Sequence, residues 1–152
     1  MAFVDWSEKY SVCNEELDKH QQRLFIIVND LHKAILGKHG KKEIRHIVDR
    51  LIEHPKSHFA VEEQLLESCG YPHRQAHKQG HENLTRQLSE LDQGFRETGK
   101  IIVCDVYAFL MKEWLFGHIL KDDRGYAPYL ANRLPASGAK TIPYGSNKNH
   151  IR

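Results

Sequence analysis

Apolar residues recur at alternating steps of three and four in four stretches of the chain, the spacing of an amphipathic helix. The stretches cover about residues 15–36, 41–68, 72–98 and 100–120. Each would be roughly 30–40 Å long at about 1.5 Å per residue. The connections between them are short, so consecutive helices should run antiparallel. We therefore predict an all-α fold, an antiparallel up-down-up-down four-helix bundle.

Two prolines fall at informative places in this pattern. Pro72 suits the first turn of the third helix, where its missing N–H is not needed. Pro55 lies inside the second helix and predicts a kink or a local break there.

The end of the chain differs in kind from the rest. Residues 131–152 contain proline, glycine and serine, four basic residues and no acid, and they lack helical periodicity. We predict one domain over residues 1–130, with an N-terminal arm before the first helix, and a basic, flexible tail over residues 131–152.

Composition excludes several classes of protein. No apolar run approaches the ~18 residues that would span a bilayer. The net charge is +2, without a basic stripe interleaved with aromatic residues, so we expect no nucleic-acid partner. The three cysteines, Cys13, Cys69 and Cys104, stand far apart. They are typical of free thiols in a reducing compartment, and we expect a cytoplasmic monomer.

Polar residues interrupt the apolar stripe of every predicted helix, and all of them are histidine or glutamate. Burying one such group without a partner is costly, so interruptions on every helix indicate one shared buried partner, for which a metal is suitable. The interruptions are His20, His58, Glu62, His77, His81 and His118.

The spacing of these residues supports a metal site. His58 and Glu62, like His77 and His81, are four residues apart and share a helix face. Asp123 follows His118 by five residues, which in a regular α-helix places the two about 140° apart around the axis. We therefore expect the fourth helix to unwind just after His118 if Asp123 is a ligand.

The residue types narrow the choice of metal. Five imidazoles and two carboxylates without a thiolate suit iron, zinc, copper or nickel better than calcium or magnesium. Seven ligands are too many for one ion of this kind, whereas two ions bridged by carboxylates would use all seven and leave one position open.

These motifs resemble the hemerythrins, and among them the bacterial single-domain form. The likeness covers about residues 4–130: the arm around Asp5 and Trp6, LDKHQQRLF, HFAVEEQLL, the GYP turn before HKQGH, WLFGHIL and the closing YAPYL. It implies a non-heme centre of two iron ions (Fe²⁺/Fe³⁺) with an oxo or hydroxo bridge. The residues it assigns as metal ligands are His20, His58, Glu62, His77, His81, His118 and Asp123.

The resemblance also implies a role for each ligand. One iron, coordinatively full, would be bound by the three histidines of the third and fourth helices. The other, with an open position, would be bound by His20 and His58. Glu62 and Asp123 would bridge the two ions. Asp122 lies beside Asp123, so a register shifted by one residue stays open.

The function implied is reversible dioxygen binding, for storage or for delivery to an oxygen-consuming enzyme, without catalysis. Trp114 and Leu115 precede His118 by four and three residues and are candidates to line the oxygen pocket. Two alternatives remain. One is a module that senses oxygen or redox state. The other is an enzyme that activates peroxide or dioxygen, although such di-iron enzymes more often use carboxylate-rich sites.

Overall fold

The structure is a computed structural model that describes residues 2–100 and 103–131. From residue 132 onward, the predicted basic tail lies outside the described residues, as do residues 1, 101 and 102. Among the described residues every regular element is helical, which confirms the all-α prediction.

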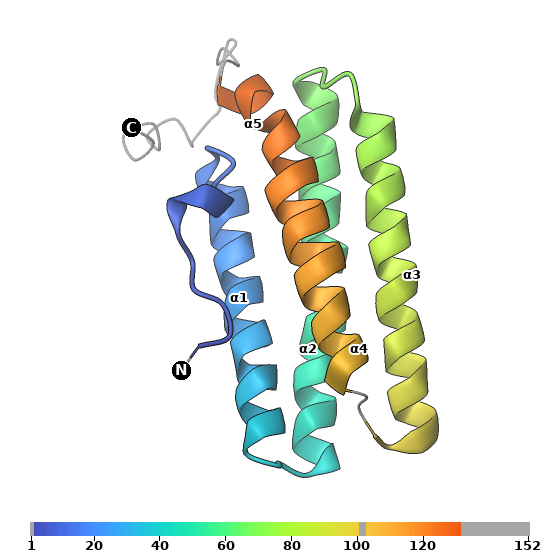
Figure 1. The fold of residues 1–152 in the computed structure, drawn as a ribbon. Coiled ribbons are helices and arrows are strands. Elements are labelled where there is room, and N and C mark those ends of the chain that lie inside the picture. Colours follow the sequence, from blue (N-terminus) through green and yellow to red (C-terminus); the bar gives the residue numbers. More distant parts are fainter. Residues whose placement is uncertain (1, 101–102, 132–152) are drawn as a thin grey trace.

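Four columns of helix form an antiparallel bundle (Figure 1). The first three columns are α1 (Glu15–Leu36), α2 (Lys41–Ser68) and α3 (Arg74–Thr98). The fourth consists of α4 (Val103–Ala108), the π-helix η2 (Phe109–Asp123) and α5 (Arg124–Ala131), which follow one another without a gap. Successive columns run in opposite directions, so the predicted up-down-up-down topology is confirmed.

Local signals explain where the first three columns begin and end. Asn14 caps α1 because its side chain accepts a hydrogen bond of 2.9 Å from the backbone N–H of Leu17. Gly99 closes α3 in the left-handed conformation, with φ 72°. Pro55 is buried inside α2 but does not break it, because a helix packed on both neighbours tolerates the loss of one backbone bond.

The fourth column departs from the predicted geometry. We expected a regular α-helix that unwinds after His118, but residues 109–123 form a π-helix. Its hydrogen bonds join residues five apart, so residues five apart return to the same face. His118 and Asp123 therefore face the bundle together without any unwinding.

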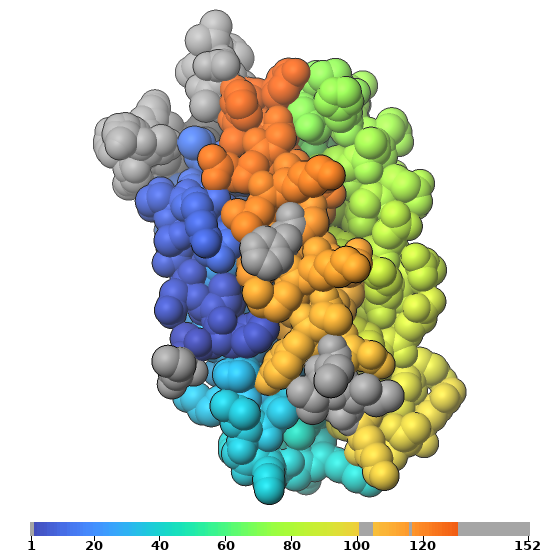
Figure 2. Space-filling view, in the orientation of Figure 1, coloured from blue at the N-terminus to red at the C-terminus, as the bar shows by residue number. Residues whose placement is uncertain are grey.

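The N-terminal arm, residues 2–14, lies on the bundle beside η2 (Figure 2). It includes the short helix η1 (Glu8–Tyr10). Two polar side chains of α1 hold it. Asn29 accepts from the backbone N–H groups of Phe3 and Val4 at 2.8 and 3.0 Å. Asp18 accepts from the Ser11 hydroxyl at 2.6 Å.

The interior has two apolar clusters with a polar layer between them. The smaller cluster, near the α2–α3 turn, contains Leu17, Leu66 and Tyr126. The larger one fills the rest of the bundle and contains Leu24 and Phe59. Between the two clusters, residues 18–23 of α1 are all polar and Glu62 is the buried residue of α2, and this layer holds the candidate site.

Candidate metal centre

Five buried side chains from three helical columns converge in the polar layer. Each offers one nitrogen or oxygen atom, and these atoms all lie within 4.8 Å of one another. The spacing of four residues on α3 and the π-helical spacing in η2 aim four of them at one point, and Glu62 of α2 completes the set. The five are Glu62, His77, His81, His118 and Asp123.

The two carboxylates occupy the middle of the cluster and have no exposed surface. Glu62 Oε1 lies 2.7 Å from His81 Nε2 and 3.0 Å from His77 Nε2. Asp123 Oδ1 lies 3.0 Å from His77 Nε2 and 3.1 Å from His118 Nε2. The other oxygen of Glu62 accepts a hydrogen bond from the Tyr126 hydroxyl.

Three buried atoms at the site lack hydrogen-bond partners among the described residues and are therefore candidate metal ligands. Nε2 of His58, Nε2 of His118 and Oδ1 of Asp123 are buried, and none makes a hydrogen bond of good geometry to any described residue. Buried polar atoms normally have partners. Imidazole nitrogens and carboxylate oxygens that lack them, and that point at one another, fit one or two divalent cations of the iron or zinc type.

The pKa shifts of the buried groups show that the two carboxylates need positive charge beside them. Burial alone would raise the pKa of Glu62, but hydrogen bonds from His77 and His81 hold that pKa well below its usual range. Burial and the Glu62 charge raise the pKa of Asp123. Burial opposes a proton on His77, yet its bonds to Asp123 and Glu62 raise its pKa to about 10. A proton on His77 thus supplies positive charge that a metal would otherwise bring.

Three residues that the sequence reasoning did not single out contact the cluster. Glu63 Oε2 lies 2.6 Å from Nδ1 of His81 and fixes the orientation of that ring. Tyr126 binds Glu62, and Gln21 of α1 lies beside Asp123. Of these three, only Gln21 could have been found from the sequence, because it follows Leu17 by four residues and precedes Leu24 by three and so lies on the apolar stripe of the first helix.

The remaining expected ligands lie at the edge of the cluster. His58 is buried, with Nε2 3.7 Å from Glu62 Oε2. Its other nitrogen, Nδ1, lies 3.1 Å from Nδ1 of His20. His20 is half-buried and is not one of the five converging residues. His54 stacks on His58, with ring centroids 5.7 Å apart.

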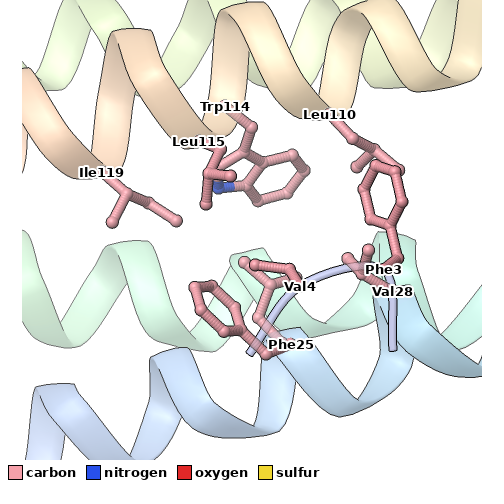
Figure 3. Close-up of a pocket in the computed structure, with 9 residues that line it drawn as sticks. Phe3, Val4, Phe25, Val28, Leu110, Trp114, Leu115 and Ile119 are labelled. Carbon is pink, nitrogen blue, oxygen red and sulfur yellow. The ribbon is translucent and has the colours of Figure 1, made fainter. Parts of the chain in front are cut away.

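The two residues expected to line a pocket are buried at an apolar cavity of about 20 Å³. Figure 3 shows Trp114 and Leu115 of η2 on one side of it and Val4 of the arm and Phe25 of α1 on the other. Ile119, next to His118 in the chain, also lines it. The cavity therefore lies one residue away from the histidine cluster along η2.

Comparison with known proteins places the whole bundle in one family. The family described as "Hemerythrin HHE cation binding domain" matches residues 14–130. Bacteriohemerythrin of Pseudomonas aeruginosa is 36% identical over 126 residues, covering 83% of this chain and 80% of that protein. Bacteriohemerythrin of Methylococcus capsulatus is 31% identical, covering 86% of this chain and 99% of that one.

Solved structures agree with the sequence comparison. A crystal structure of wild-type hemerythrin superposes with a TM-score of 0.74 at 26% identity, covering 86% of this chain and 99% of that chain. Within the described residues, none of the helices has both the length and the apolarity needed to cross a membrane.

The position of Asp123 yields a first prediction. Asp123→Ala should abolish tight metal binding, because a buried carboxylate at the centre of the cluster is lost. Asp122→Ala should weaken binding by about tenfold at most, because Asp122 only approaches His118 Nδ1, at 3.7 Å. Metal per chain after gel filtration measures both. The reverse pattern would show that Asp122 is the ligand.

The raised pKa of His77 yields a second prediction, for protein stripped of metal. Its stabilising contribution is fully present below the ordinary histidine value of about 6.5 and is lost as the pH rises toward 10. The urea midpoint should therefore fall between about pH 7 and about pH 9.5. His77→Gln should flatten that fall, whereas His46→Gln, at an exposed site, should not. An equal fall in both variants would contradict this assignment.

Proposed function

Because this chain belongs to the hemerythrin family, we propose that it binds dioxygen reversibly at a non-heme centre of two iron ions. The observation that carries the proposal is the buried cluster of three imidazoles and two carboxylates, with His58 at its edge. Iron held by these residues would supply reversible redox chemistry toward dioxygen. We further propose that the protein stores dioxygen or delivers it to an oxygen-consuming enzyme.

The residues divide between two ions. His77, His81 and His118 surround one side of the carboxylate pair and would hold the first iron. His58 faces Glu62 Oε2 and would hold the second. Glu62 and Asp123 would bridge them. The sequence expectation gives the seventh ligand to His20, which contacts His58 rather than the carboxylates.

The surroundings favour a carrier over an enzyme. The centre is enclosed by the two apolar clusters, which exclude the water that would promote side reactions. The phenol of Tyr126 is buried against Glu62, and burial raises its pKa well above the ordinary value. The Tyr126 hydroxyl donates its proton in a hydrogen bond to Glu62.

The proposal predicts both a metal content and a spectrum. Protein from iron-replete cells should contain about two irons per chain, and an iron charge-transfer band should appear in air and vanish under argon over repeated cycles. His58→Ala should lose most of the band, whereas His46→Ala should keep it. One zinc without iron would refute the di-iron assignment, and consumption of dioxygen in each cycle would favour the enzyme alternative.

The apolar cavity predicts how the carrier is protected from oxidation. Leu115→Glu or Leu115→Ser should still assemble two irons, but should admit water or a proton donor and decay to the ferric form about tenfold faster or more. The measurement is the first-order loss of the oxygenated band in air. Ile26→Glu, at an exposed apolar residue of α1, is the control. If both Leu115 variants decayed to the ferric form at the wild-type rate, Leu115 would not be the residue that shields the iron.

A further inference from the structure

Gln21 is the side chain of α1 that reaches the metal centre. It is 2% exposed, and its Nε2 lies 3.1 Å from Oδ2 of Asp123. Its amide oxygen, Oε1, is buried and has no hydrogen-bond partner among the described residues. A buried amide that is only half satisfied is unusual in a native interior and calls for a partner that the protein itself does not supply.

The two carboxylates divide the centre into two sides. Asp123 turns Oδ1 to the histidines at 77 and 118, and Oδ2 to Gln21. Glu62 turns Oε1 to the histidines at 77 and 81, and Oε2 to His58. One oxygen of each carboxylate therefore faces the imidazoles of residues 77, 81 and 118, two imidazoles to each oxygen. The other oxygen of each faces a second half-site, whose remaining groups are the imidazole of His58, the amide of Gln21 and the Tyr126 hydroxyl, which bonds Oε2 of Glu62.

His20 has a different position. Its Nδ1 meets Nδ1 of His58, whereas Nε2 of His58 is the nitrogen that faces Glu62. A group that bonds the outer nitrogen of an imidazole fixes the tautomer and the orientation of that ring. His20 thus contacts the ring nitrogen of His58 that does not face the carboxylates.

We propose that the amide oxygen of Gln21, rather than the imidazole of His20, ligates the second metal ion, and that His20 is a positioning residue for His58. The inference rests on the proposed function only in requiring a second metal ion. Rotation of the amide by half a turn exchanges its oxygen and nitrogen, so Oε1 can replace Nε2 beside Oδ2 of Asp123 without a backbone movement.

The two half-sites would then differ in chemistry. The first has three imidazoles and two carboxylate oxygens, whereas the second has one imidazole and three oxygens. Oxygen ligands favour Mn²⁺ and Mg²⁺ more than imidazole does and bind iron less tightly. The second iron should therefore leave first when a chelator is added, and Mn²⁺ should compete for that position.

The test uses the full chain loaded anaerobically with Fe²⁺, so that dioxygen chemistry plays no part. Gln21→Leu should retain one iron per chain in place of two, and Gln21→His should release the second iron to a chelator about tenfold more slowly than wild type. Gln22→Leu, at the exposed neighbouring residue, should behave as wild type. If Gln21→Leu is poorly folded, Gln21→Glu serves instead and should also slow release.

His20 is tested by a direct count of ligating histidines. In the Fe²⁺ protein, strongly shifted N–H proton resonances should arise from the imidazoles of residues 58, 77, 81 and 118, and none from His20. His20→Asn, whose side-chain oxygen can still accept from His58, should keep two irons.

Two results would overturn the inference. One is a shifted resonance that disappears in His20→Asn together with one iron. The other is a Gln21→Leu protein that keeps both irons as tightly as wild type. Two irons held as described but inert to dioxygen would refute only the proposed function.

Discussion

Glu62 and Asp123 are the constraint on which the rest of the centre depends. Two carboxylates without solvent cannot both be charged unless positive groups surround them. Imidazoles from α3 and η2 meet this need. Hydrogen bonds from His77 and His81 hold the pKa of Glu62 low, while burial keeps the pKa of Asp123 high. The apolar clusters above and below seal the layer, so the attraction acts in a medium of low dielectric constant.

The π-helix is the second requirement, because it allows one column to present two candidate ligands five residues apart. In an α-helix, Asp123 would point about 140° away from His118. A π-helical hydrogen-bond pattern is rare and is poorer in packing, and it occurs mostly at functional sites. Here the cost is offset by a carboxylate placed between His77 and His118. Tyr126 of α5, three residues after Asp123, donates a hydrogen bond to Glu62.

The apolar periodicity predicted the bundle, its topology and the limits of α1 and α2, because these helices have a regular repeat and clear end signals. It could not predict η2, because an apolar stripe at steps of three and four over residues 100–120 is what a regular α-helix gives, and it carries no signal of a π-helical hydrogen-bond pattern. Nor could it choose between His20 and Gln21. Each lies three or four residues from both Leu17 and Leu24, so spacing allowed either, and the preference for histidine rested on its chemistry alone. The structure places Gln21 in the core and His20 at its edge.

The N-terminal arm forms part of the wall of the cavity beside the histidines, through Phe3 and Val4, and the Asn29 side chain is what bonds the backbone of both. Segments that lie on a bundle outside its long helices open locally with free energies below that of global unfolding. The arm is thus the wall element that opens most often, while α1 and η2 stay closed. Entry and exit of a small gas at this cavity would then follow the fraying rate of a few residues, which natural variation in the arm can change without altering any ligand of the metals.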